Sequence, residues 1–212
     1  DNNVYGDSNQ IIGDDNVVHA DDSNIIGSGN TTYEDGQVIL GNNNLADGLA
    51  NNISGSDNTV NGDYNNATGN ANYVGYMGDY VNKAVVLGNN NYAWGDNAVV
   101  VGNNSQAVYN DVAIGTNADV LADNSVAVGS NSTVAAGAEN AVALGAGSLA
   151  SETGTVSVGS DGSDGSDVFQ RRITNVANGT ATYDAINRGQ LNSMTARIND
   201  QLDDVEDKAY GG

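Results

Sequence analysis

The sequence predicts an all-β solenoid, a parallel β-roll, that runs into a short coiled-coil helix. Gly and Asn recur first with a period of seven residues and then with a period of about fourteen. The 212-residue chain contains 28 Gly and no Pro, and apolar residues spaced alternately by four and three lie near its C-terminal end. Such repeats cannot bury an apolar face alone and become stable by stacking on one another.

Residues 1–83 show the shorter period. From Asn2 they read NNVYGDS, NQIIGDD, NVVHADD and SNIIGSG, and the register holds for ten blocks, eight of which have Gly at the fifth place. A coiled coil shares this period, but it needs two apolar seam positions per heptad, and each helical Gly costs about 1 kcal/mol relative to Ala. Short strands joined by Gly and Asn turns fit better, because these residues accept positive φ.

Residues 84–159 show the longer period. Each unit opens with an apolar run that ends in Gly, such as AVVLG at 84–88 or AVALG at 141–145, and a weaker strand follows it. Two strands and two turns per fourteen residues describe one coil of a parallel β-solenoid. At about 4.8 Å per coil, some eleven coils would span roughly 50 Å.

The apolar runs also predict that copies of the chain pack together. Because side chains alternate along a strand, we expect Val142 and Leu144 to face the interior of the coil and Ala143 to face outward. Runs that are apolar throughout are usually covered on both faces, and sister chains are the economical cover. The alternative is that small apolar side chains tolerate solvent. The interface residues predicted in the roll are Val86, Val100, Ala113, Ala127 and Ala143.

The C-terminal part predicts a helix that also needs partners. Leu191, Thr195, Ile198, Leu202, Val205 and Ala209 have the spacing of a coiled-coil seam. Fewer than three heptads are marginal alone, so residues 192–212 are predicted to start a longer stalk. Residues 160–191 are predicted to be the junction and neck before it.

Several segments resemble the YadA-like trimeric autotransporter adhesins. NSVAVGSNS at 124–132 is similar to the head repeat of that family, and RRITNVANGTATYDAINRGQL at 171–191 is similar to its neck motif. The resemblance covers residue 84 onward well and residues 1–83 loosely. It implies a left-handed parallel β-roll head, a homotrimer, a neck, a trimeric coiled-coil stalk and a membrane anchor outside this sequence. It also implies a trimer interface that includes Ile173, Val176, Leu191, Ile198, Leu202 and Val205.

The same resemblance implies an adhesin displayed outside the outer membrane of a Gram-negative-type bacterium. Such a head would attach to host matrix, to host cell surfaces or to other bacteria. The alternative is a structural spacer whose binding site lies elsewhere in the full-length protein. The net charge of −21, from 27 acidic and 6 basic residues, argues against nucleic acid or an anionic membrane as partner.

Catalysis and metal binding find little support in the residue types. His19 is the single histidine and stands where other blocks have Tyr, Ile or Leu, which argues against a catalytic triad and a His-rich metal site, and the absence of Cys excludes a thiolate metal site. A polysaccharide-cleaving solenoid would need a groove with clustered cations and aromatics, and a lattice-binding one would need a rank of Thr; neither pattern occurs. We therefore expect no enzyme activity and no cofactor.

Acidic turn residues are the remaining candidates for chemistry. The pairs Asp14 with Asp15 and Asp21 with Asp22 could serve as glycosidase acids, but nothing distinguishes them from solvated turn residues. In SDGSDGSD, at 160–167, the Asp side chains invite a Ca²⁺ interpretation, but the bidentate Glu of an EF-hand loop is missing. We expect a solvated loop and no metal site.

Aromatic residues gather around the one break in the repeat. Rings with polar tips often anchor partners, and irregular segments on a rigid scaffold commonly carry function. The alternative is that they fill a transition between two kinds of repeat. The candidate ligand-binding residues are Tyr73, Tyr76, Tyr80, Tyr92 and Trp94.

Overall fold

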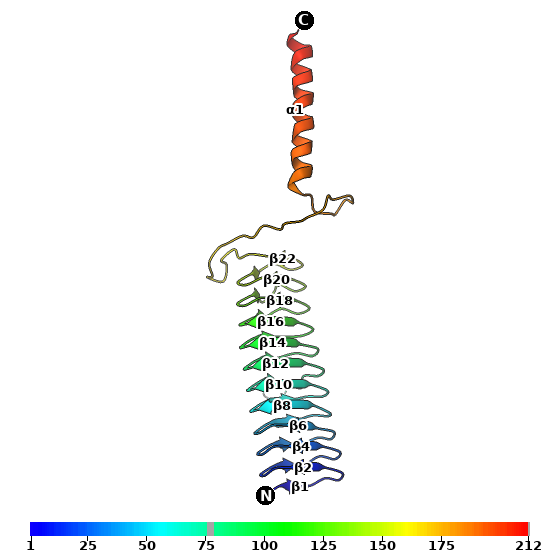
Figure 1. The fold of residues 1–212 in the computed structure, drawn as a ribbon, viewed down its shortest axis with the longest axis vertical. Coiled ribbons are helices and arrows are strands. Elements are labelled where there is room, and N and C mark those ends of the chain that lie inside the picture. Colours follow the sequence, from blue (N-terminus) through cyan, green and yellow to red (C-terminus); the bar gives the residue numbers. More distant parts are fainter. Residues whose placement is uncertain (76–78, 212) are drawn as a thin grey trace. The chain divides into compact units, whose positions relative to one another are not determined.

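The computed structural model describes residues 1–75 and 79–211 and divides the chain into two compact units, Asp1–Gln170 and Arg171–Gly212 (Figure 1). The first unit is a β-solenoid. The second consists of an irregular neck and one helix, α1 (Arg188–Tyr210).

The solenoid is built from two parallel sheets of eleven strands each, in which every strand pairs with the strand two places along the chain. The odd sheet contains β1 (Asn3–Val4), β3 (Val17–Val18), β5 (Thr31–Thr32), β7 (Leu45–Asp47), β9 (Thr59–Asn61), β11 (Tyr73–Val74), β13 (Tyr92–Ala93), β15 (Gln106–Ala107), β17 (Asp119–Val120), β19 (Thr133–Val134) and β21 (Leu149–Ala150). The even sheet contains β2 (Gln10–Ile12), β4 (Asn24–Ile26), β6 (Val38–Leu40), β8 (Asn52–Ser56), β10 (Asn66–Asn70), β12 (Val85–Asn89), β14 (Val99–Asn103), β16 (Val112–Thr116), β18 (Val126–Val128), β20 (Val142–Leu144) and β22 (Val156–Ser157).

The register shows that fourteen residues form one coil from the start of the chain. Asn3 pairs with Val17 and Asn24 pairs with Val38, so each seven-residue block is half a coil. The one large insertion lies between β10 and β12, where Asn66 pairs with Val85. Both sheets continue across it, so the subdivision predicted at residue 83 coincides with no break in the roll. The prediction of a parallel β-roll is confirmed.

The interior of each coil is narrow and receives one side chain from each strand. In the even strands this is the second residue, which is Ile at positions 25, 39 and 53 and Ala at positions 113, 127 and 143. In the odd strands it is residues such as Val60, Val120 and Val134. These side chains stack into one continuous core along the roll.

The predicted direction of the apolar runs is therefore wrong. Val86, Val100, Ala113, Ala127 and Ala143 are fully buried inside the coil of their own chain and cannot contact a sister chain. The space between the sheets accommodates one row of side chains from each sheet, so the middle residue points inward. The two flanking residues, predicted to face inward, point outward.

A buried ladder of Asn side chains supports the turn before the odd strands. The Asn30 Oδ1 accepts hydrogen bonds from the backbone N–H and from the side-chain amide of Asn44, both at 3.0 Å. The Asn44 amide also donates to the carbonyl of Gly55 at 2.8 Å. The same pattern repeats along Asn16, Asn30, Asn44, Asn58, Asn72 and Asn91. Backbone groups of the turns that would otherwise be buried without partners are thereby satisfied.

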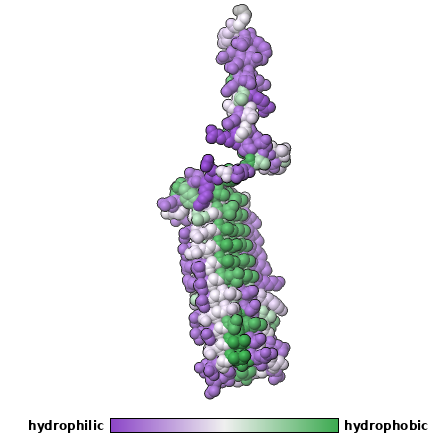
Figure 2. All heavy atoms as spheres, in the orientation of Figure 1, coloured by the Kyte–Doolittle hydropathy of each residue, from purple (hydrophilic) through white to green (hydrophobic). Residues whose placement is uncertain are grey.

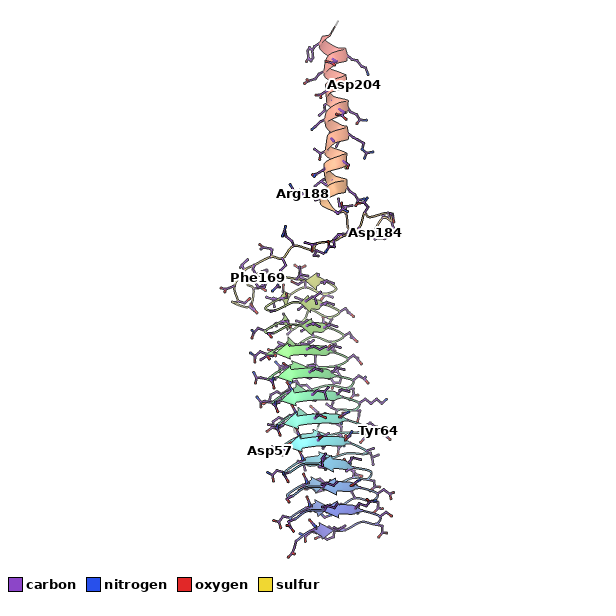
Figure 3. All side chains as sticks on the ribbon, in the orientation of Figure 1. Asp57, Tyr64, Phe169, Asp184, Arg188 and Asp204 are labelled. Atoms are coloured by element: carbon purple, nitrogen blue, oxygen red, sulfur yellow. The ribbon has the colours of Figure 1, made fainter. Side chains whose placement is uncertain are left out.

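The place where each even strand leads into its turn requires Gly for two reasons. Gly88 has φ of 121°, which L side chains rarely adopt, and a Cβ built there would lie 1.7 Å from the carbonyl oxygen of Gly102 in the next coil. Other turn positions at each edge have positive φ but point into solvent. Figure 3 shows Asp57 and Tyr64 projecting from opposite edges of the roll in this way.

Side-chain hydrogen bonds join the neck of the second unit to the start of α1. Asn187 caps α1 by accepting from the Gln190 N–H at 3.1 Å, and its amide donates to the Val176 carbonyl at 3.0 Å. The Gln190 side chain in turn bonds both backbone groups of Gly179. The helix begins at Arg188, where this cap sets its start, and the predicted stalk boundary at residue 192 lies within it. Among the described residues, no helix combines the length and the apolar character that crossing a membrane demands.

The glycine requirement gives a prediction with an internal control. Gly88→Ala should lower the free energy of unfolding by about 3 kcal/mol or more, because strain and a backbone clash act together. Gly137 also has positive φ, but a Cβ added there would have nothing within 4 Å, so Gly137→Ala should cost only about 1 kcal/mol. Urea denaturation followed by circular dichroism measures both, and equal losses would contradict the prediction.

Candidate binding and assembly surfaces

The outward face of the even sheet carries a long apolar stripe. It arises because the first and third residues of most even strands are aliphatic and point away from the coil interior. Ile12 and Val156 are among the most exposed, at 65% and 66%. Figure 2 shows the stripe as a band over the even strands. The apolar stripe consists of Ile12, Ile26, Val38, Leu40, Val85, Leu87, Val99, Val101, Val112, Ile114, Val126, Val128, Val142, Leu144 and Val156.

Two adjacent coils interrupt this stripe with polar side chains. In β8 the outward residues are Asn52 and Ser54, and in β10 they are Asn66 and Thr68. These residues are register partners, so they form one polar belt across the face. The inward residues between them, Ile53 and Ala67, remain fully buried. The belt therefore changes the outer surface without breaking the core.

The sequence analysis missed the stripe because it assigned these residues to the interior. A signal was present: the middle residue of the run shrinks to Ala or Ser in the later repeats, whereas its neighbours remain Val, Leu or Ile. A narrow interior favours the small residue, and the larger ones must lie outside.

The odd sheet differs in carrying aromatic residues on its outward face. The ring of His19 stacks between Tyr5 and Tyr33, with centroid distances of 4.4 Å and 5.8 Å. These three residues occupy equivalent places in successive coils, so the spacing of the coils itself stacks their rings. His19 thus belongs to an aromatic ladder, and its neighbours in that ladder are not catalytic partners.

The predicted ligand-binding aromatics are only partly brought together. Tyr92 stacks with Tyr73 and with Trp94, at 5.3 Å in each case and with nearly parallel rings. Tyr80 lies on the insertion, and its hydroxyl reaches the carboxylate of Asp47 at 3.4 Å. Tyr76 falls outside the described residues.

The acidic turn residues behave as capping groups. In the 160–167 loop, the Asp161 and Asp164 carboxylates accept backbone N–H bonds from Ser163 and Ser166, both at 2.9 Å. These bonds, together with those of the serine side chains, lower the pKa of both carboxyls. No cluster of three or more potential metal ligands occurs in the described part of the chain. Asp14, Asp15, Asp21 and Asp22 are exposed in turns.

One carboxylate is buried within the roll itself. Asp111 has no exposed surface and occupies a turn position where Asn51, Asn65 and Ser125 stand in other coils. Its two oxygens accept the backbone N–H groups of Ser125 at 2.8 Å and Val108 at 3.0 Å. Burial nevertheless dominates and raises the pKa of Asp111 to about 6.

The neck and helix present a second apolar surface. A groove of about 500 Å³ is lined by residues that include Ile173, Val176 and Ile186. No residue of α1 is buried, and the seam side chains Leu191, Ile198, Leu202 and Val205 are between 44% and 63% exposed. A lone helix with such a seam gains little from its own packing.

Comparison with known families identifies the parts of the chain. A model of the YadA head domain repeat matches residues 82–105, 109–132 and 136–161. A model of the coiled stalk of trimeric autotransporter adhesins matches residues 172–211, so the two models together match more than half of the chain.

The chain belongs to the YadA-like trimeric autotransporter adhesins. It comprises an adhesin head and the beginning of the stalk. The three matched head segments cover the coils from β12 to the end of the roll, and the stalk match includes the neck and α1.

A solved structure shares the fold of this YadA-like head. It is the collagen-binding domain of the Yersinia adhesin YadA, which is 22% identical, with a TM-score of 0.51 over 87% of this chain and 86% of that chain. No curated protein matches the sequence. The likeness extends beyond the matched head repeats, and the N-terminal heptad-like blocks therefore belong to the same kind of roll.

The buried Asp111 makes the stability of this YadA-like head depend on pH. Because the folded-state pKa of about 6 exceeds the ordinary value of 3.8, the protonated form favours folding, and this contribution is lost as pH rises from about 4 to 6. Relative to Asp111→Asn, the parent chain should lose about 2–3 kcal/mol of unfolding free energy between pH 4 and pH 7.

Denaturation by urea at the two pH values measures this difference. Asp22→Asn, which removes an exposed turn carboxylate from a distant coil, is the control and should follow the parent. If Asp111→Asn and the parent change in parallel, Asp111 is not the titrating group.

Proposed function

We propose that this chain is the attachment head of a homotrimeric adhesin on the surface of a Gram-negative-type bacterium. It binds host matrix, host cell surfaces or other bacteria, and it has no catalytic role. The family match supports the adhesive role and the surface location. The collagen-binding domain of the Yersinia adhesin has the same fold, which makes collagen a ligand to test first.

The apolar stripe carries the trimer proposal. Aliphatic side chains of one outward face line up over nearly the whole roll, and monomeric proteins rarely expose patches of this extent. Three copies packed with these faces inward would bury the stripe and leave the odd sheets outside. In the second unit, the seam of α1 and the apolar neck groove are also exposed apolar surfaces that a trimer would cover.

The trimer interface proposed here replaces part of the predicted set. In the roll it consists of the apolar stripe, and not of Val86, Val100, Ala113, Ala127 and Ala143. In the neck and stalk it consists of Ile173, Val176, Leu191, Ile198, Leu202 and Val205, as predicted. We also propose residues 160–191 as junction and neck, and residues 192–212 as the first part of the stalk.

The stripe gives a matched pair of variants. Ile114 lies on the even sheet and Leu121 on the outward side of the odd sheet, and their exposures in the single chain are 39% and 40%. Ile114→Asp should destabilise the trimer by about 3 kcal/mol or more, because each copy would bury an unpaired charge. Leu121→Asp should leave the trimer unchanged.

Light scattering after size exclusion, repeated along a urea series, measures this effect on the full chain. The parent should have three times the chain mass of 21.6 kDa. A monomeric parent, or equal sensitivity of the two variants, would refute the interface.

The adhesive role needs a binding panel. The assembled chain should bind at least one of collagen, fibronectin, laminin or intact bacteria, with avidity from its repeated surface. Leu121→Asp should remain a folded trimer, so comparing it with the parent shows whether the outward face of the odd sheet takes part in binding. If the assembled parent binds nothing on the panel, the chain is a structural spacer and the attachment site lies elsewhere in the protein.

A further inference from the structure

Charge is distributed very unevenly between the two units. Residues 1–170 hold 21 of the 27 Asp and Glu side chains and a single cation, Lys83, and so carry −20 of the net −21. Lys83 lies in an edge turn, where its backbone N–H donates to the Asp63 carbonyl, and not on the face of a sheet. A surface with such a negative field attracts cationic partners and repels anionic ones.

One row on the odd sheet combines rings with polar groups. Tyr73 pairs with Tyr92, Tyr92 with Gln106, and Gln106 with Asp119, so these four side chains leave the same face at intervals of about 4.8 Å. Trp94 stands two residues beyond Tyr92 on that face and stacks with it. We call these five residues the aromatic-acidic row.

A hydrogen bond links the indole to the amide side chain beside the carboxylate. The Trp94 Nε1–H donates to the Gln106 Oε1 at 3.2 Å, which orients the amide so that its NH₂ group can face Asp119. Partial burial raises the pKa of the Asp119 carboxyl, and the neighbouring Gln106 side chain opposes this rise only in part. Neither ion pair of the described residues involves Asp119. The row thus holds a half-buried carboxylate in place without a cation beside it.

The stacking within the row favours a basic side chain over a sugar. Sugars pack on open ring faces, but here Tyr92 stacks with both Tyr73 and Trp94, so the rings cover much of one another's faces. Ring edges and hydroxyls remain for a partner. The aliphatic stem of a Lys or Arg can lie along such edges while its charged group reaches a carboxylate.

We propose that the aromatic-acidic row is a docking site for a Lys- or Arg-bearing segment of a basic partner protein, with Asp119 as its ion-pair acceptor. This proposal rests on the proposed adhesive function in that it names the partner chemistry for the outward face of the head. The Gln106 amide and Trp94 position the carboxylate, and Tyr73 and Tyr92 supply contact area.

A decalysine peptide is the probe, with a Gly-Ser peptide of equal length and maltoheptaose as neutral probes. The measurement is the dissociation constant of each probe for the full assembled chain, by fluorescence anisotropy or calorimetry at physiological salt. Asp119→Asn should weaken decalysine binding about tenfold. Asp123→Asn makes the same charge change at an exposed turn residue of the same coil and should weaken it less than twofold.

A second variant tests the positioning of the carboxylate. Trp94→Phe keeps a ring but removes the donor to Gln106, so it should weaken decalysine binding severalfold while leaving the unfolding transition close to that of the parent. Equal effects of Asp119→Asn and Asp123→Asn would show diffuse charge attraction only and overturn the site. Tighter binding of maltoheptaose than of decalysine would also overturn it, in favour of a sugar.

The outcomes separate the site from the broader function. If the chain binds a component of the matrix and bacterial panel while Asp119→Asn and Asp123→Asn bind decalysine alike, the docking site fails and the adhesive function stands. If Asp119→Asn loses decalysine binding selectively but the parent binds nothing on the panel, the site stands and the attachment function fails.

Discussion

The structure depends on stacking identical backbone turns directly above one another at the spacing of β-strands. Strands satisfy their own hydrogen bonds in such a stack, but some turn groups find no backbone partner, and such groups buried between coils would each cost about 1–3 kcal/mol without partners. The Asn ladder meets this constraint, because one side chain, such as that of Asn44, accepts the backbone N–H of Asn58 and donates to the carbonyl of Gly55, both in the next coil. Gly88 and its equivalents meet it in the same turn by leaving no Cβ in the path of the next carbonyl.

The same constraint determines which surfaces are left for assembly. Coils that stack this closely are thin, so the core takes one side chain per strand and the remaining aliphatic residues must lie outside. Val142 and Leu144 flank the buried Ala143 for this reason. The apolar stripe is thus a direct product of the repeat, and the surface that favours assembly follows from the same residues that build the coil.

The periodicity of the sequence was sufficient to predict the roll, the coil number and the helix, because Gly, Asn and apolar residues recur at places set by backbone geometry. The inward face was predicted wrongly, because alternation along AVALG defines two faces without saying which is enclosed, and only the small middle residue of the later repeats indicates the inward one. The insertion before Lys83 also concealed that the seven-residue blocks are half-coils of the later unit. The aromatic-acidic row was missed in part, since Gln106 and Asp119 align with Tyr92 only when coil length is known, and one of these coils has thirteen residues.

The two sheets of the roll differ in the chemistry of their outer faces. The even sheet is aliphatic and nearly uncharged on its outer face, whereas the odd sheet and the edge turns hold the rings and most of the carboxylates. Packing even faces together would therefore bury apolar surface without burying charge, and the like charges of three chains would remain in solvent, where salt screens them. The polar belt of Asn52, Ser54, Asn66 and Thr68 fits this view as a discontinuity in the stripe. In the proposed trimer, Asn and Thr placed against aliphatic residues of a slipped neighbour would lose hydrogen bonds to water, so the belt would favour the register in which the belts of the three chains align.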